Sequence, residues 1–99
     1  MKIAPIHDIK NIIASHHDTV VFICHSDEAQ EQLLHKLMEL EYTWSTRRAL
    51  DNAEGLNTIR DSYNLPRGFR VLKSSRSVYF ADEKHYVTKT AHPTIRVVL

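Results

Sequence analysis

The strongest constraint on the fold is an uninterrupted apolar run, TVVFIC, at residues 19–24. The run is rich in β-branched residues and lacks polar alternation, so it predicts a central strand with both faces covered. Ser26 follows as an N-cap, and a helix is predicted over 27–41. Its apolar stripe consists of Ala29, Leu33, Leu34, Leu37 and Leu40. We expect this helix to pack against the strand through Leu33, Leu34 and Leu37.

Weaker patterns extend along the rest of the chain. Helices are predicted over 5–15 and 54–63, and residues 45–53 are predicted to form a loop. Pro5 suits the first turn of the earlier helix, where its missing N–H costs nothing. Short strands are predicted over 42–44, 69–72, 78–80 and 95–99. The last of them is short enough for a sheet edge, and residues 82–92 are polar and ambiguous.

This order of elements predicts one α+β domain spanning residues 1–99. It would contain a small mixed sheet of about five strands with two to three helices packed on it. The segment 19–45 fits a parallel crossover within that sheet.

Length and composition bound the class of protein. A chain of 99 residues accommodates one hydrophobic core. The formal net charge of +1 provides no overall field that would attract nucleic acid or an anionic membrane. Cys24 is the only cysteine, which excludes an internal disulfide. Neither a signal-like segment nor an apolar run of membrane length occurs, so we expect a cytoplasmic protein.

Histidine and cysteine are the first candidates for chemistry. Neighbours on a strand point to opposite faces, and neither HExxH nor CxxC occurs, so no metal ligand is predicted. Cys24 precedes a helix N-terminus, where a thiolate can be favoured, and His25 adjoins it. The chain lacks the arginine and the glycines of a phosphate-binding cysteine loop. We expect Cys24 to be a buried, unreactive residue, and we predict no catalytic residue and no cofactor.

The charges are unevenly distributed along the chain. Residues 25–43 are mostly acidic, and Asp27 and Glu31 are expected to be ordinary solvated helix charges. Residues 44–76 are mostly basic; arginine forks bind phosphates, and aromatic faces stack on bases. The candidate binding residues are Trp44, Arg47, Arg48, Arg67, Arg70 and Arg76. The alternative is that the arginines are exposed charges balancing the acidic helix, with Trp44, Tyr63 and Phe69 in the core.

Part of the chain resembles a known group of proteins. Residues 20–86 run through an apolar strand, a helix that opens with SDE, the segment YTWS at 42–45 and the strand SVYF at 77–80. This order resembles small α+β proteins encoded by bacteriophages and prophages that carry a Tyr-x-Trp-Ser motif. Glu41 stands where that group usually has glycine, so the loop need not adopt the group's turn. The resemblance implies an accessory protein acting on a host factor or a nucleotide signal, and it implies no reaction.

Three functions follow from these observations. The leading one is a non-enzymatic, phage-type accessory protein that binds and modulates a host macromolecule, as an interaction or inhibitor module for a host protein. The alternative is an anion-binding module for a nucleotide or nucleic acid that uses segment 44–76. A third is a small enzyme based on Cys24 and His25. Salt dependence separates the first two, because phosphate contacts weaken steeply as salt rises.

Overall fold

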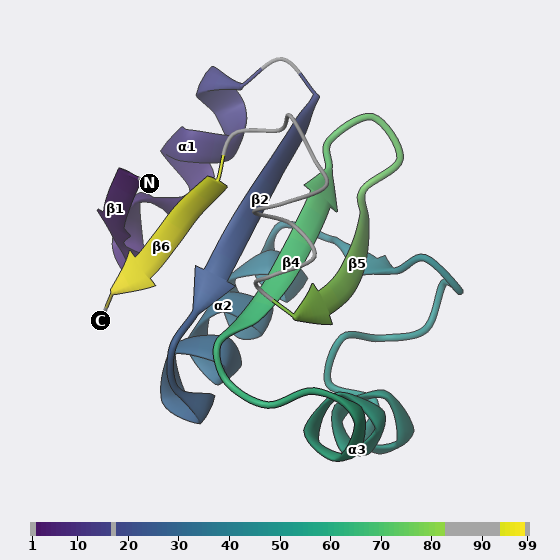
Figure 1. Ribbon diagram of the computed structural model, residues 1–99. Coiled ribbons are helices and arrows are strands. Elements are labelled where there is room, and N and C mark those ends of the chain that lie inside the picture. The colour runs from purple at the N-terminus through teal and green to yellow at the C-terminus, as the bar shows by residue number, and fades with distance from the viewer. Residues whose placement is uncertain (1, 17, 83–93, 99) are drawn as a thin grey trace.

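The chain forms one mixed sheet with helices packed against it (Figure 1). The computed structural model describes residues 2–16, 18–82 and 94–98. The described strands are β1 Lys2–Pro5, β2 Thr19–Cys24, β3 Thr43–Trp44, β4 Arg67–Leu72, β5 Ser77–Asp82 and β6 Thr94–Val98. The described helices are α1 Ile9–Ser15, preceded by a 3₁₀ turn over Ile6–Asp8, α2 Asp27–Glu39 and α3 Ala53–Ser62. The predicted α+β fold is confirmed, with six described strands in place of the expected five.

The strand order across the sheet is β1-β6-β2-β4-β5-β3. Strand β4 runs antiparallel to both of its neighbours, and the other described pairs are parallel. Strands β2 and β3 therefore point the same way, as expected of a crossover, but β4 and β5 lie between them. The prediction that the last strand lies at an edge is wrong, because β6 is held between β1 and β2.

Strand β1 is absent from the sequence-based prediction. Pro5 ends this strand and precedes the 3₁₀ turn, so its predicted position in the first turn of a helix is wrong. Residues Lys2–Pro5 pair in parallel with residues 95–98 of β6, at the far end of the chain. A proline at the end of an edge strand costs no ladder hydrogen bond, and a partner so distant in sequence leaves no local pattern.

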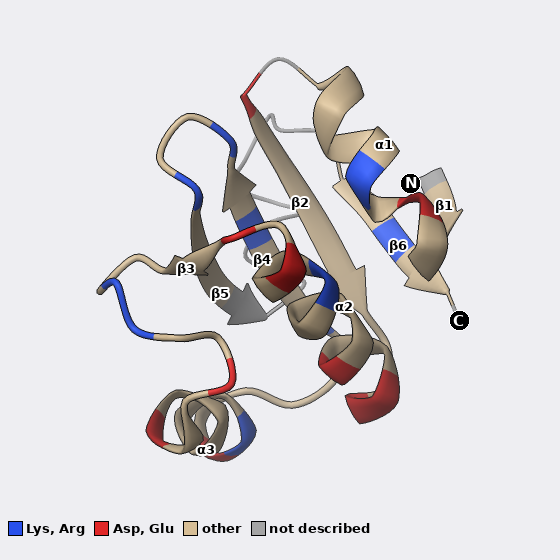
Figure 2. Cartoon of the chain, turned by 180° about the vertical axis from the view of Figure 1, so that it is seen from behind, with Lys and Arg blue, Asp and Glu red and all other residues tan. Residues whose placement is uncertain are grey.

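The strand β2 is buried on both faces, which confirms the prediction drawn from its apolar run. Val20, Phe22 and Cys24 belong to the main core cluster on the side of α1 and α2. Val21 and Ile23 point to the opposite face and are also fully buried. Figures 1 and 2 show α1 and α2 on one face of the sheet and α3 beyond its lower end.

Helix α2 begins and ends with identifiable caps. The Ser26 hydroxyl accepts a hydrogen bond from the Ala29 N–H at 3.1 Å, as expected for an N-cap. Glu41, just beyond the helix, has φ 67°, which places it in the left-handed region. Its carboxylate accepts a hydrogen bond from Arg76 Nη1 at 2.9 Å. The turn thus takes the conformation that favours glycine although a glutamate occupies it.

Other element boundaries shift by one to three residues. Strand β4 begins at Arg67, two residues before the predicted start, and β5 extends over residues 77–82. Helix α2 ends at Glu39, and α3 begins at Ala53. The ambiguous segment 82–92 lies outside the described residues apart from Asp82, as does Leu99.

Candidate functional site

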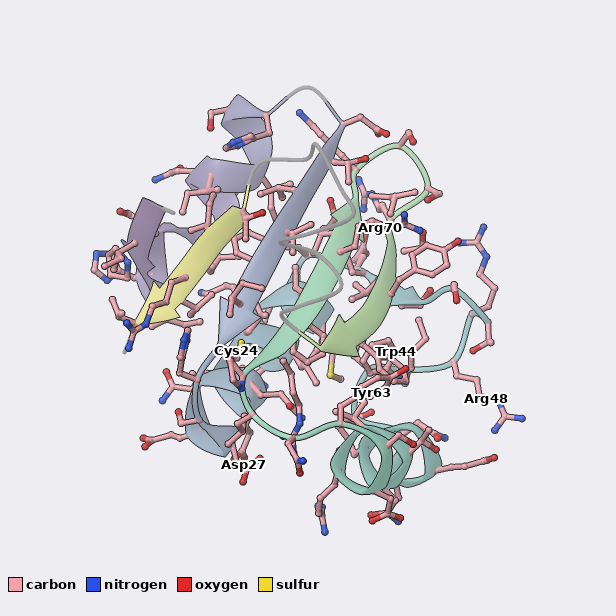
Figure 3. All side chains as sticks on the ribbon, viewed as in Figure 1. Cys24, Asp27, Trp44, Arg48, Tyr63 and Arg70 are labelled. Atoms are coloured by element: carbon pink, nitrogen blue, oxygen red, sulfur yellow. The ribbon has the colours of Figure 1, made fainter. Side chains whose placement is uncertain are left out.

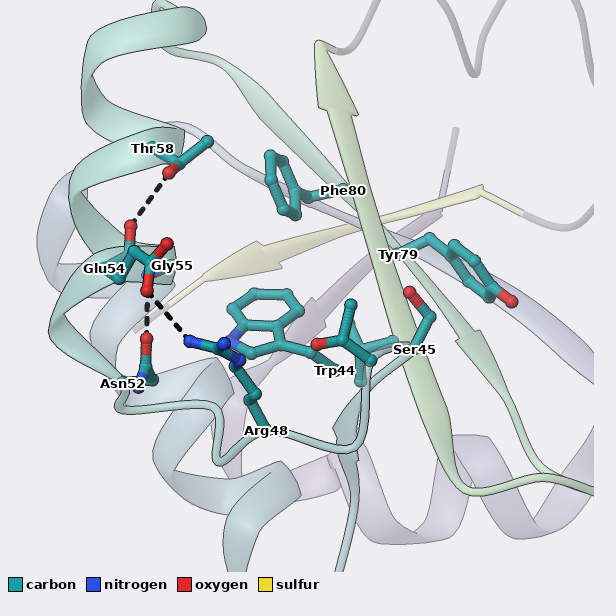
Figure 4. A pocket seen from close by; sticks show the side chains of 11 residues that line it. Trp44, Ser45, Arg48, Asn52, Glu54, Gly55, Thr58, Tyr79 and Phe80 are labelled. Carbon is teal, nitrogen blue, oxygen red and sulfur yellow. Dashed lines mark hydrogen bonds and ion pairs between the residues drawn. The ribbon is translucent and has the colours of Figure 1, made fainter.

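A groove separates α3 from the outer edge of β5, and Trp44 lies at its centre (Figure 4). Its volume is about 420 Å³. Its walls come from β3 and the loop after it, from α3 and from β5. The lining residues that matter most are Trp44, Ser45, Arg48, Gly55, Thr58 and Phe80. We refer to this feature as the Trp44 groove.

Trp44 is held in the groove by strand pairing and aromatic packing. Strand β3 aligns it with Val78 of β5. Its ring meets Phe80 edge-on at 5.4 Å between centroids and lies 6.4 Å from the Phe69 ring. Only 6% of Trp44 is exposed, and Phe69 is fully buried, so both aromatics belong to the core, whereas Tyr63 is half-buried. Trp44 is therefore a core residue that also presents a surface to the groove.

The indole N–H of Trp44 has no hydrogen-bond acceptor among the residues that the structure describes. Its Nε1 atom is buried and has no partner within the described part of the chain. A Cβ on Gly55 would lie 3.0 Å from this nitrogen, so the glycine permits the first turn of α3 to approach the indole. Asn52 caps that turn by accepting the Gly55 N–H at 3.1 Å. Buried donors without acceptors are uncommon in folded proteins, so the unpaired indole N–H is an unusual feature of this groove.

Two charged residues that line the groove form an ion pair. Arg48 Nη1 lies 2.8 Å from Glu54 Oε2, and the two side chains are 59% and 77% exposed (Figure 4). Glu54 sits in the first turn of α3, where the helix dipole favours a carboxylate. An exposed pair of this kind contributes at most about 1 kcal/mol. Arg48 can therefore exchange Glu54 for a group on a ligand at little cost.

A tight turn at residues 44–48 carries Arg47 and Arg48. The Arg47 N–H donates to the Trp44 carbonyl at 2.8 Å, and the Trp44 N–H donates to the Arg48 carbonyl at 3.0 Å. Arg47 adopts φ 71°, in the left-handed region. Its guanidinium donates to the Ser75 carbonyl at 3.1 Å, whereas Arg48 reaches toward α3. The two adjacent arginines therefore diverge, and only Arg48 lines the groove.

Arg67 has a structural position. Its side chain is 6% exposed, and its Nη1 donates to Asp27 at 2.7 Å and to Gln30 at 2.9 Å. Its Nε donates to the Tyr63 carbonyl at 2.9 Å. These bonds join β4 to α2 and to the end of α3, beside a second cleft of about 710 Å³ between the two helices. Asp27 is exposed, as predicted, but it is also the counter-ion of Arg67.

Arg70 and Arg76 do not line the Trp44 groove, although Arg70 stacks on Tyr79, which does. The Arg70 guanidinium lies 4.6 Å from the centre of the Tyr79 ring, and its register opposite Val21 puts it on the sheet face away from α2. Arg76 is paired with Glu41. Figure 3 shows Arg70 well separated from Trp44 and Arg48, and Figure 2 shows the basic segments scattered over several elements. The six predicted residues do not form one basic patch.

Several groove residues escaped the sequence-based prediction. Ser45, Gly55, Thr58 and Phe80 line the groove although no pattern singled them out. The asparagine cap of α3 was a detectable signal, since Asn at an N-cap is strongly preferred. Helix α3 lies beside β5 because β3, which precedes the helix, pairs with β5. This pairing joins residues more than thirty positions apart, so no local sequence pattern predicts it.

Cys24 is shielded from solvent and reagents. It is fully buried, and desolvation raises the pKa of its thiol to about 12, an effect only partly offset by the nearby Arg67 charge. The thiol therefore stays protonated at neutral pH, which opposes a role as a nucleophile.

We expect Cys24 to resist modification by a maleimide in the folded protein at neutral pH. The maleimide cannot reach the buried sulfur, and the thiol stays protonated although the thiolate is the form that reacts. The measurement is the labelling rate by mass spectrometry in buffer and in denaturant. Rapid labelling only in denaturant agrees with this prediction, and equal rates in both would contradict it.

The described residues contain no group of three or more His, Cys, Asp and Glu side chains placed to hold a metal ion. None of their helices is both long enough and apolar enough to cross a membrane. Comparison with family models, curated proteins and solved structures finds no significant match to this chain.

Proposed function

We propose that this protein is a non-enzymatic binding module that engages a partner protein through the Trp44 groove. The supporting observation is one groove that combines an aromatic centre with an exposed Arg48–Glu54 pair, and whose central indole has no acceptor for its buried N–H among the described residues. Tryptophan and arginine are enriched among residues that dominate the energy of protein interfaces. Concave sites with an apolar lining and a few polar groups are typical binding sites.

The distribution of the arginines favours a protein partner over a nucleic acid. Arg67 and Arg76 already contact Asp27 and Glu41, and Arg70 lies on the other face of the sheet. A polyanion gains affinity by contacting several cations along one surface, and its binding weakens as salt rises. A groove with one arginine and one glutamate supports such binding less well than a protein interface.

The resemblance to phage-encoded proteins suggests the kind of partner. A protein of this type would bind a bacterial host protein and modulate it. The test is capture of partners from bacterial lysate by the tagged protein, with and without nuclease, followed by mass spectrometry. A partner that survives nuclease treatment supports the proposal, whereas a partner lost with nuclease supports the nucleic-acid alternative.

We expect the double variant Arg47→Ala/Arg48→Ala to weaken binding of the captured partner at least tenfold, about 1.4 kcal/mol. Both side chains are exposed, and their bonds to Ser75 and Glu54 are surface interactions, so the melting temperature should change by only a few degrees. The measurements are calorimetric titration with the partner and a thermal melt.

The matched control is Lys10→Ala/Arg96→Ala, which removes the same charge from exposed positions away from the groove. It should leave the affinity for the partner unchanged. Equal binding by the wild type and the Arg47/Arg48 variant would remove this turn from the binding site. A collapse in thermal stability would show instead that these arginines are structural.

A further inference from the structure

We infer that the groove receives an extended segment of the partner, which adds to the sheet as a strand along the part of the β5 edge that no described strand covers. This rests on the proposed function and specifies how the partner would bind. Proteins commonly recognise extended peptides by strand addition at an exposed sheet edge, with side-chain pockets providing specificity. The Trp44 groove runs beside such an edge, with α3 as its opposite wall.

Strand β3 covers only the start of the β5 edge. Its register pairs Thr43 with Ser77 and Trp44 with Val78, and the Ser45 N–H then donates to the Val78 carbonyl at 3.2 Å. Beyond that bond the chain turns away at residues 44–48. Among the described residues, no strand continues beside β5 from Tyr79 onward.

The peptide groups of Phe80 face this open edge. Peptide groups alternate between the two sides of a strand. Since the Val78 carbonyl points to β3, the N–H and carbonyl of Phe80 point to the same side. The peptide groups of Tyr79 point instead to β4, opposite Arg70. Phe80 thus offers one donor and one acceptor to a strand lying about 4.8 Å away, where the groove is open.

The surroundings define the chemistry of the added strand. Side chains of such a strand would alternate between the two faces of the sheet. Those directed to the helical face would meet Trp44 and Phe80, so we expect apolar or aromatic residues there. Its backbone would pair with the N–H and carbonyl of Phe80, beside which no described strand lies.

Arg48 favours a bound segment that contains a carboxylate. Arg48 has Glu54 as its counter-ion, and Arg47 has no carboxylate partner within the described chain. Arg48 lines the groove, and because its exposed pair with Glu54 is weak, it can exchange that carboxylate for one on the bound segment. We expect the bound segment to contain an Asp or Glu next to its apolar residues, because complementary charge sets the register of binding partners.

The test uses an mRNA-displayed library of random peptides of about ten residues, the length of a long strand. Peptides selected on the wild type should bind the variant Thr58→Trp at least tenfold more weakly. Thr58 is exposed on the groove side of α3, and an indole there would fill the groove. The matched control is Asn57→Trp, an exposed neighbour that lines neither cleft, which should bind as the wild type does.

Amide exchange measured by NMR then tests strand addition itself. Exchange of the Phe80 N–H should slow at least tenfold when a selected peptide binds, whereas the Tyr79 N–H, which faces β4, should change little. A peptide that occupies the groove and leaves Phe80 exchange unchanged would overturn strand addition and leave the proposed function standing. Strand addition is also wrong if no peptide is selected, or if Thr58→Trp and Asn57→Trp bind equally well.

Discussion

Leu37→Ala is expected to lower the free energy of unfolding by about 2–5 kcal/mol. Leu37 is fully buried and belongs to the core cluster that also contains Leu33 and Phe22. Truncation removes the transfer free energy of the deleted methyl groups and leaves a cavity that the surrounding residues fill only in part. The measurement is chemical denaturation followed by circular dichroism, with the midpoint and slope fitted for both proteins.

The control for this prediction is Gln32→Ala, an exposed position on the same helix. Alanine is the better helix former, so this change should alter stability by less than about 1 kcal/mol. A loss below about 0.5 kcal/mol for Leu37→Ala would mean that α2 packs on the sheet by a different face.

Asp27→Asn is expected to reduce stability by about 1–2 kcal/mol, between the values for exposed and buried ion pairs, because Arg67 is buried and Asp27 is exposed. Arg67 is almost completely buried, and among the described residues Asp27 is the one carboxylate paired with it. Asparagine keeps an amide oxygen at this position, but the guanidinium then has only neutral acceptors, which include the Gln30 amide oxygen and the Tyr63 carbonyl. A buried charge without its counter-ion costs far more than an exposed one, even though Asp27 itself is accessible.

The matched control for Asp27 is Glu28→Gln. Both residues lie in the first turn of α2 and interact with the helix dipole, but only Asp27 contacts Arg67. The Glu28 change should cost no more than about 1 kcal/mol. The double variant Asp27→Asn/Arg67→Met should recover part of the loss, because it replaces the buried cation with an apolar side chain. Equal losses for Asp27→Asn and Glu28→Gln would contradict a structural role for the Arg67 pair.

The turn after α2 shows how a local rule can be outweighed. Glycine is favoured at φ 67°, yet Glu41 occupies that conformation. Two contacts hold it there: its N–H donates to the Met38 carbonyl at 3.0 Å, and its carboxylate accepts from Arg76. Arg76 precedes β5, so the side chain that pairs with Glu41 comes from a part of the chain that is distant in sequence.

The best predicted elements were those with strong local signals. The apolar run of β2 requires burial on both faces, and the serine cap and leucine stripe of α2 depend on residues only three or four positions apart. Burial of Cys24 follows from its place at the end of that run. These features could be predicted because hydrophobic period and capping are properties of neighbouring residues.

The sequence by itself therefore determined the α+β class, the central strand and its covering helix, and an aromatic strand followed by two arginines. Only the tertiary structure decided the strand order, the place of β1, the pairing of Arg67 with Asp27 and the formation of the Trp44 groove. Each of these depends on residues tens of positions apart, whose meeting is set by the path of the crossovers. Local periodicity carries no information on that path. It could therefore not predict that the six candidate binding residues lie in different places, or that α3 lies beside β5.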